Sequence, residues 1–502
     1  MFSHLFRRLP RHSTLSWAGA AGAAAGAAGT AGAVGVMVGN FRRMGRCEED
    51  VTFLLQRVVE RQGPGIAQEF EAGRAVLQQV NQVLSSHFGH LKLSAIDPVA
   101  VFFKVLEQQE LRTLQWKKEQ ASATIPGLHD LEGDVLLFND LLKYARLADV
   151  AYAPDEDFMS QQLEGEWKFL TGSSTARPQR PAHFLAIQGN KVVLAIRGTQ
   201  TIADCLTDCL CDGEVFHDGF AHRGATEASQ WLCQEYGPAL KFLEAKGYEV
   251  VVVGHSLGAA VAAACCVQLR KSGLVPSARC VCFAPPATVD PTLAKEAAGY
   301  ITSVVHDDDV IPRLQIMSIL RLYQEILSHN WLSGAKEMVG WIREDPQQSW
   351  ILDIGDQAFG LLETRLESHW KEQSARFREE LKQFEAQSKE IQPLSIPGFI
   401  VHLYRCPAGY GVIKAPPESF SRIELSSSMV ADHFLDAYIE SLQSVLQAAE
   451  ASHREKLQAL QRLLPEGPEA AEAFQQFAEI SKSVHELVLK ARSTLQARPD
   501  TS

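Results

Sequence analysis

The sequence lacks an excess of positive charge. Among its 502 residues, 48 lysines and arginines stand against 60 aspartates and glutamates, which gives a formal net charge of -12. A surface that binds nucleic acid needs a basic excess to neutralise phosphates, so this balance argues against a nucleic-acid partner. It does not exclude membranes, because a local basic segment or an apolar face is enough to dock on a lipid surface.

The chain also lacks the cysteine arrangement of a disulfide-stapled protein. Several of its ten cysteines are neighbours within segments that we predict as strand or helix, such as Cys265 with Cys266 and Cys280 with Cys282. Cysteines placed in this way are poorly oriented for bonding with each other. We therefore expect reduced thiols and a reducing compartment. Neither an internal repeat nor the cysteine spacing of a metal finger is present, so we expect no metal site of that kind.

Acidic residues are missing from positions 1–47, which form a basic leader. All six charged residues there are arginines: Arg7, Arg8, Arg11, Arg42, Arg43 and Arg46. In a helix, the first three would lie on the side opposite an apolar face formed by Phe2, Leu5, Phe6 and Leu9. An acid-free amphipathic pattern of this kind resembles a mitochondrial presequence. We therefore expect a membrane-associated protein, with mitochondria as the compartment that the leader indicates.

Within this leader, residues 17–39 carry no charge and consist mostly of alanine, glycine and valine. At helical rise this run is long enough to cross a bilayer, although alanine and glycine contribute little transfer energy. The pairs Gly22/Gly26 and Gly35/Gly39 have the spacing of packed membrane helices. We interpret the run as a membrane segment, and the alternative is a disordered leader. Arginines flank both ends and leave its orientation open.

Beyond the leader, the hydrophobic pattern changes along the chain. Residues 48–135 show helical spacing, and residues 136–445 alternate short strand-like runs with helices. A helical insertion of about 314–392 interrupts that second region, and a helical tail of 446–502 follows it. The insertion holds four of the eight tryptophans. These residues indicate either a cap or bilayer contact, or else the core of a helical pair.

The region 136–445 predicts an α/β fold with a mostly parallel central sheet. We expect strands at 183–188 and 191–197 around a Gly189-Asn190 turn, and further strands at 248–253, 280–283, 301–305 and 399–404. Most of these runs are apolar throughout, as expected of strands buried on both faces. A helix at 259–271 lies between two of them, which predicts right-handed βαβ connections.

Gly254-His255-Ser256-Leu257-Gly258 follows a run of four valines and precedes an alanine-rich helix. This is the context of a nucleophile elbow, in which a serine occupies a tight strand-to-helix turn and only small residues fit two positions away on either side. Its hydroxyl would lie at the helix N-terminus, where free N–H groups favour negative charge. We predict Ser256 as the nucleophile.

A serine needs a histidine base, which in turn needs an orienting carboxylate. In this fold the chain order is serine, acid, histidine. Asp307, Asp308 and Asp309 follow the expected strand at 301–305, and spacing alone does not choose among them. His402 lies within a predicted strand, so we expect it to be structural. His433 lies in a later loop or helix start and is the predicted base.

When a serine attacks a carbonyl group, the carbonyl oxygen becomes negatively charged, and two backbone N–H donors are needed to stabilise it. One is predicted to be the N–H of Leu257, directly after the nucleophile. Thr199 follows the strand that ends at Arg197 and offers a second N–H together with its hydroxyl. The alternative for Thr199 is an ordinary turn residue.

Five blocks in order resemble class 3 lipases, with the sn-1-specific diacylglycerol lipases as the nearest likeness. They are Arg197-Gly198-Thr199, Ala221-His222-Arg223-Gly224, Gly254-His255-Ser256-Leu257-Gly258, Asp309-Val310-Ile311-Pro312-Arg313 and the stretch 423–433. In that family the acid directly precedes the Val/Ile-Pro pair, which selects Asp309. The resemblance also supports His433 and Thr199, and it implies a structural role for His222. It further implies an α/β-hydrolase fold, with the 314–392 insertion placed where the family carries a gating segment.

The resemblance implies a serine lipase that hydrolyses glycerolipid acyl esters, with diacylglycerol as substrate and a membrane surface as partner. A catalytically silent lipid-binding scaffold is the rival from another class, and an acyltransferase or soluble-ester hydrolase would share the chemistry. We expect no required cofactor, and calcium is suggested as a cofactor by the family resemblance alone. One departure stands out, because the resembling diacylglycerol lipases usually carry a bundle of membrane helices before the hydrolase.

Overall fold

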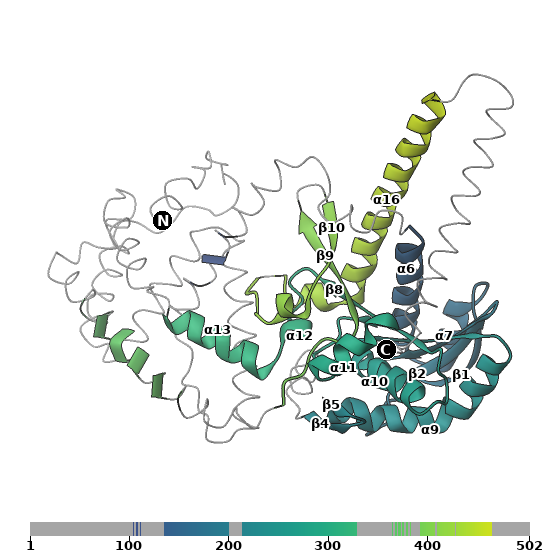
Figure 1. Ribbon diagram of the computed structural model, residues 1–502, viewed down its shortest axis with the longest axis horizontal. Helices are drawn as coiled ribbons and strands as arrows, with labels where there is room; N and C mark the ends of the chain where they lie inside the picture. The colour runs from purple at the N-terminus through teal and green to yellow at the C-terminus, as the bar shows by residue number, and fades with distance from the viewer. Residues whose placement is uncertain are drawn as a thin grey trace, which may run out of the picture. The chain divides into compact units, whose positions relative to one another are not determined.

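A computed structural model gives the structure of the protein (Figure 1). It describes residues 135–199, 213–328, 392–406, 409–426 and 428–463, with isolated positions between 104 and 111 and between 364 and 382. The chain divides into two compact units. The first comprises 1–113, 323–386 and 425–427, and the second comprises 114–322, 387–424 and 428–502.

The second unit is built on one eight-stranded sheet, in the order β1-β2-β3-β6-β7-β8-β9-β10. Strands β3, β6, β7, β8 and β9 are parallel, whereas β1, β2 and β10 pair antiparallel at the two edges. The bounds are β1 Lys168–Ser173, β2 His183–Gln188, β3 Lys191–Ile196, β6 Glu249–His255, β7 Arg279–Phe283, β8 Ile301–His306, β9 Phe399–Cys406 and β10 Gly409–Lys414. This is the mostly parallel sheet that the sequence predicted.

Helices cover both faces of the sheet. The core on one face joins α6, α7 and α16 to Val251 and Val253 of β6, and the core on the other face joins α9 and α10 to Val250 and Val252. The unbroken valine run is therefore explained, because alternate side chains enter opposite cores. The helices are α6 Val135–Val150, α7 Glu156–Leu163, α9 Arg223–Ala245, α10 Leu257–Lys271, α11 Pro291–Glu296, α12 Val310–Arg313, α13 Ile316–Ser328 and α16 Leu435–Leu463.

Shorter elements complete the described unit. A hairpin of β4 Gly213–Phe216 and β5 Gly219–His222 stands outside the main sheet. Three 3-10 turns are η2 Ala297–Gly299, η4 Pro417–Phe420 and η5 Ala431–His433. The α/β-hydrolase fold class is confirmed by this sandwich of helices around a mostly parallel sheet.

Each strand predicted from an apolar run is present, and β2 pairs antiparallel with β3 as expected. The sequence analysis missed β1, β10 and the β4–β5 hairpin. These lie at sheet edges or outside the main sheet and are only partly buried, so their hydrophobic pattern is weak. Helix α16 runs through residue 446, where a separate tail was expected, and Leu446 and Ala449 still pack on the core shared with α6.

Several predictions lie outside the described residues. These are the leader 1–47 with its segment 17–39, most of 48–135, most of the insertion 314–392, and 464–502. Within the portion of the chain that the structure describes, no helix combines the length and apolarity needed to span a bilayer.

Candidate active site

Ser256 lies at the junction of β6 and α10, in the bend predicted for the nucleophile. Its backbone angles are φ 60° and ψ -131°, in a region that non-glycine residues rarely occupy. The side chain is almost completely buried. Strained backbone at a buried hydroxyl, held between a strand and a helix, is a feature of sites where geometry is needed for chemistry.

The two flanking glycines are required by close backbone approaches. A Cβ on Gly254 would lie 2.2 Å from the carbonyl oxygen of Gly258. A Cβ on Gly258 would lie 2.4 Å from the carbonyl oxygen of Ile196, at the end of β3. No side chain fits in either place, because real Cβ contacts are longer than 3 Å. The bend therefore brings Ser256 against the end of β3.

His433 contacts Ser256 from a position far along the chain. Its Nε2 lies 3.0 Å from the Ser256 hydroxyl oxygen, and its Nδ1 lies 3.0 Å from Oδ1 of Asp309. Both side chains are buried. A carboxylate only accepts hydrogen bonds, so Nδ1 carries the proton of the neutral imidazole. Nε2 is then an acceptor and is positioned to take the proton of the serine.

The structure brings one of the three consecutive aspartates to the histidine. Asp309 receives hydrogen bonds from the Tyr438 hydroxyl at 2.6 Å and the Ile311 N–H at 2.9 Å, in addition to His433. Burial alone raises the pKa of Asp309, but His433 and these hydrogen bonds outweigh it and hold the pKa below its ordinary value. Asp307 instead pairs with Arg405.

Comparison with known proteins relates part of the chain to one family. Residues 193–318, which include Thr199, Ser256 and Asp309, match the family described as lipase (class 3). This part of the chain is similar to the class 3 lipases. His433 lies beyond the matched residues.

Two relatives illustrate the extent of this similarity. Mouse diacylglycerol lipase-beta is 33% identical over 147 residues, which is 27% of this chain and 22% of the relative. The secreted mono- and diacylglycerol lipase A of Penicillium camembertii is 34% identical over 169 residues, 30% of this chain and 52% of the relative. The chain thus spans about half or less of the length of these relatives.

Among solved structures, a lipase from Rhizopus microsporus var. chinensis is 15% identical. The match covers 59% of this chain and 86% of the Rhizopus chain, with a TM-score of 0.38.

A chain of hydrogen bonds that was not predicted from the sequence runs behind the elbow. The Gly198 N–H donates to the Tyr152 hydroxyl at 3.2 Å, and that hydroxyl lies 2.9 Å from Nδ1 of His255. Nε2 of His255 lies 2.8 Å from the backbone carbonyl of His433. A carbonyl only accepts, so Nε2 is the donor, Nδ1 accepts, and Tyr152 donates its proton to His255.

Burial keeps His255 uncharged within this hydrogen-bond chain. Burial, and secondly the neighbouring His433, lower the pKa of His255 to about 3, so the ring is neutral at physiological pH. A neutral ring beside His433 leaves Asp309 as the charged partner of the base. His255 lies within the Gly-x-Ser-x-Gly motif, which could have drawn attention to it, whereas no local pattern distinguishes Tyr152.

The two predicted oxyanion residues flank the serine. Leu257 is the first residue of α10, where the N–H has no carbonyl partner within the helix. A Cβ on Gly198 would lie 3.0 Å from the Cβ of Ser256, so the end of β3 is next to the nucleophile. Thr199 is the following residue and is half-buried. The oxyanion role of both residues stays a prediction.

Three further histidines occupy structural positions. His222 is the N-cap of α9, and its Nδ1 accepts the Ala225 N–H at 3.2 Å. His402 lies in β9, with its Nε2 3.2 Å from the Asp307 carbonyl oxygen. Burial lowers the pKa of His306 and brings that of His402 to about 3. These placements agree with the structural roles expected for His222 and His402.

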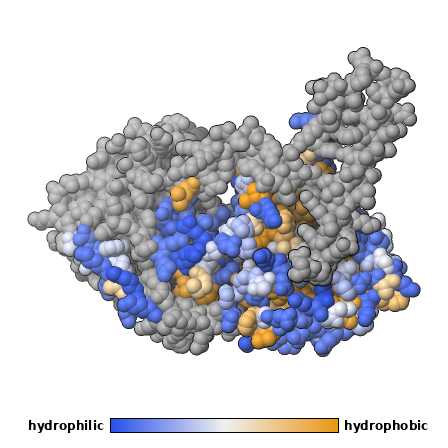
Figure 2. Space-filling view, in the orientation of Figure 1, coloured by the Kyte–Doolittle hydropathy of each residue, from blue (hydrophilic) through white to orange (hydrophobic). Residues whose placement is uncertain are grey.

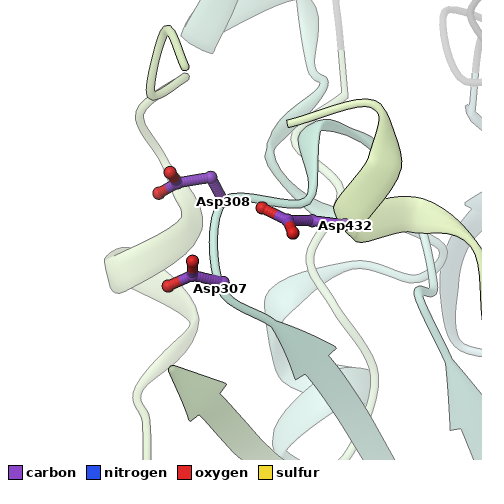
Figure 3. A group of neighbouring side chains, drawn as sticks. All are labelled: Asp307, Asp308 and Asp432. Atoms are coloured by element: carbon purple, nitrogen blue, oxygen red, sulfur yellow. The ribbon is translucent and has the colours of Figure 1, made fainter. Parts of the chain in front are cut away.

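Beside the acid loop, three carboxylates lie close together. Asp307, Asp308 and Asp432 each place an oxygen within 4.8 Å of the others, and Figure 3 shows them gathered from two segments of the chain. The Arg405 guanidinium already lies among them, paired with Asp307 and Asp432. A cation of the protein is therefore already paired with two of the three carboxylates, and the expectation that no cofactor is required stays a prediction.

Apolar side chains reach the surface near the base and elsewhere. Phe434, directly after His433, is 51% exposed, and Val215 of the β4–β5 hairpin is 75% exposed. On the face drawn in Figure 2, hydrophobic patches interrupt a mainly hydrophilic described surface.

Proposed function

We propose that this chain is a serine hydrolase of the lipase type that hydrolyses glycerolipid acyl esters. The proposed reaction converts diacylglycerol and water into monoacylglycerol and a fatty acid. The observation that carries the proposal is the buried relay from Ser256 through His433 to Asp309, with two links of 3.0 Å each. Relatedness to class 3 lipases supports it.

In the proposed mechanism, Nε2 of His433 takes the Ser256 proton as the serine oxygen attacks the ester carbonyl carbon. The carbonyl oxygen becomes negative and accepts hydrogen bonds from the N–H groups of Leu257 and Thr199. His433 then gives its proton to the departing glyceride oxygen, which leaves an acyl-serine. Water attacks this ester with His433 again as base, and the fatty acid is released as Ser256 regains its proton.

Asp309 stabilises the imidazolium that forms during each proton transfer. Its depressed pKa keeps it ionised throughout, and its hydrogen bonds to Tyr438 and Ile311 fix the orientation of its carboxylate. The acid therefore serves as a fixed charge rather than as a proton carrier.

The diacylglycerol substrate is proposed from the relatives. The curated relatives include proteins named diacylglycerol lipase-alpha and -beta and secreted mono- and diacylglycerol lipase A. The half-exposed Phe434 beside the base supports an apolar acyl substrate. We also propose a membrane surface as the place where the substrate is met.

Two rival functions make different predictions. A silent lipid-binding scaffold does not need a buried serine, imidazole and carboxylate in hydrogen-bonded order, so this relay argues against it. An acyltransferase uses the same acyl-serine but passes the acyl group to an alcohol instead of water. Product analysis of a reaction in the presence of glycerol separates these two activities. Hydrolysis releases a free fatty acid, whereas acyl transfer forms an ester of glycerol instead.

The decisive variant is Ser256→Ala. We expect it to lose labelling by a fluorophosphonate probe and to lower the turnover of diacylglycerol by about three to six orders of magnitude, because members of a triad act as a unit. The matched control is Ser229→Ala, which removes a buried serine from α9 outside the site. Wild-type turnover in Ser256→Ala would exclude the serine mechanism, and an unlabelled, inactive wild type would favour the scaffold.

A further inference from the structure

Two separate loops must meet for the relay to form. The acid loop follows β8 and holds Asp307 and Asp309, and the base loop holds Ser428, Asp432 and His433. The loops are far apart in sequence, and the only polar link of the relay between them is the contact of Asp309 with His433. Something outside the relay has to oppose their separation, because a displacement of 1 Å can reduce a rate about a hundredfold.

Arg405 contacts both loops from the end of β9. Its Nη1 lies 2.5 Å from Oδ2 of Asp307, and its backbone N–H donates to Oδ1 of the same residue at 3.2 Å. Its Nη2 pairs with Oδ1 of Asp432, and Nη1 also donates to the Ser428 hydroxyl at 3.3 Å. Asp307 is two residues before the proposed acid, and Asp432 directly precedes the proposed base.

The backbone of Asp307 shows that the acid loop needs such support. Its φ is 34°, in the left-handed region that non-glycine residues seldom adopt. The Leu403 carbonyl accepts the Asp307 N–H at 2.6 Å, and the Arg313 guanidinium donates to the Asp307 carbonyl at 2.6 Å. Together with Arg405, these contacts hold a strained turn that directs Asp309 toward His433.

The contacts of Arg405 with Asp307 and Asp432 are ion pairs, so their loss would leave these two carboxylates without this cation. The Asp432 side chain is fully buried, and those of Asp307 and Arg405 are 18% and 37% exposed. Without the guanidinium, Asp307 and Asp432 would lose the cation that they share, and the three carboxylates of Figure 3 would still lie close together. Like charges at this separation repel in a poorly solvated site, so the two loops would be driven apart.

We propose that Arg405 is a positioning residue that clamps the acid loop to the base loop and so holds Asp309 and His433 in register for proton transfer. The assignment rests on the proposed hydrolase function. A planar fork serves here because it meets two carboxylates at once, which a lysine ammonium cannot do with the same geometry. The hydrogen bond from the Val310 N–H to the Met429 carbonyl, at 3.2 Å, is a second link between the loops. The clamp therefore tunes the relay and is not its sole support.

The test compares Arg405→Gln with Asp307→Asn, their double variant and the control Arg279→Gln. Arg279 pairs with Glu249 at 3.3 Å at the starts of β7 and β6, outside the site. We expect Arg405→Gln to lower kcat about 10- to 100-fold with KM within twofold of wild type, because alignment is lost but substrate contacts are not. Asp307→Asn should lower kcat in the same way but less. The double variant should be no slower than Arg405→Gln alone, since both changes remove one shared contact.

The outcomes separate this proposal from the one on which it rests. A wild type that neither hydrolyses diacylglycerol nor reacts with a fluorophosphonate overturns the hydrolase function itself. An active wild type with unchanged kcat in Arg405→Gln overturns the clamp alone, and so does an additive loss in the double variant. If melting curves show that Arg405→Gln does not fold, Asp307→Asn decides, and wild-type kcat in that variant rejects the clamp.

Discussion

Asp307 and Asp309 are two residues apart in one loop, yet their surroundings move their pKa values in opposite directions. Burial, then Asp308 and Asp432, raise the pKa of Asp307 to about 6 against the opposing effect of Arg405. Around Asp309, the imidazole of His433 and three hydrogen bonds overcome burial and lower the pKa. Identical side chains thus serve different purposes, one as a fixed charge and one as a partner of an arginine.

This opposition predicts how stability changes with pH. Between about pH 4, the unfolded value for aspartate, and pH 6, native Asp307 binds more proton than the unfolded chain. Its contribution to stability therefore falls as pH rises through this window, by up to about 2–3 kcal/mol. Asp309 has a depressed folded pKa, so its stabilising contribution is complete above about pH 4 and is lost only in stronger acid.

In Asp307→Asn the side chain no longer titrates, so the fall in unfolding free energy from pH 4 to pH 6 should be smaller than in wild type. Urea unfolding at several pH values measures this difference. Asp157→Asn, an exposed change in the first turn of α7, is the control and should follow the wild type. A wild-type pH dependence in Asp307→Asn would contradict the perturbed pKa of Asp307.

At this scale the sequence predicted Ser256 as nucleophile and His433 as base, but spacing left three aspartates open. Spacing does not choose among neighbours, because the choice depends on partners from distant elements, such as Tyr438 of α16 for Asp309 and Arg405 of β9 for Asp307. The family motif supplied what spacing could not. Tyr152 was not predicted for the same reason, because its role depends on the hydrogen bonds of its hydroxyl with Gly198 and His255 in the folded protein.

At the scale of elements, the elbow is a three-way contact between β6, α10 and the end of β3. Gly258 lies in the first turn of α10 and against the backbone of Ile196 and Arg197. The α10 helix can approach β3 so closely only because residue 258 has no side chain. The predicted requirement for small residues around the serine is therefore met by a contact that local sequence does not reveal.

We expect Gly258→Ala to destabilise the protein by at least about 1–3 kcal/mol, because the added Cβ would overlap rigid backbone 2.4 Å away. Gly224→Ala is the matched control, as Gly224 also occupies the first turn of a helix, α9, with its nearest neighbour at 3.5 Å. That control should unfold at the same free energy or higher by up to about 1 kcal/mol, since alanine is the better helix former. Equal melting temperatures for the two variants would contradict the close approach at the elbow.

The central strands were predictable because both of their faces are buried, so each one is a run of consecutive apolar residues. Edge strands are not, because their exposure depends on where the sheet stops. β1 alternates irregularly between exposed and half-buried positions and was missed. The predicted boundary at residue 445 falls inside α16, whose packing on the core shared with α6 continues to Leu446 and Ala449.

At the scale of the whole molecule, the described hydrolase unit and the basic leader have different physical characters. The unit is built around two apolar cores on one sheet, whereas residues 1–47 carry arginines and no acid. We propose that the leader, with its uncharged run 17–39, directs membrane association and specifies mitochondria. The proposed catalytic residues all lie in the second unit, so the two properties should be separable.

Deletion of residues 1–47 tests this separation. We expect the shortened protein to lose its membrane fraction and any mitochondrial co-localisation in imaging, while a fluorophosphonate still labels Ser256. The control replaces Arg177 and Arg180, two surface arginines of the hydrolase unit, with glutamine and should leave localisation unchanged. Unaltered localisation after the deletion would assign membrane association to another part of the chain.

The parallel pairing of β8 with β9 has a consequence for how this architecture tolerates change. The polypeptide leaves the sheet after β8 and returns in the adjacent strand, so the distance between exit and return is set by a strand ladder, not by the intervening chain. Doubling the length of such an excursion adds only about 0.6 kcal/mol of closure entropy. The part of this excursion beyond α12 can therefore change in length while Ser256, Asp309 and His433 keep their mutual distances.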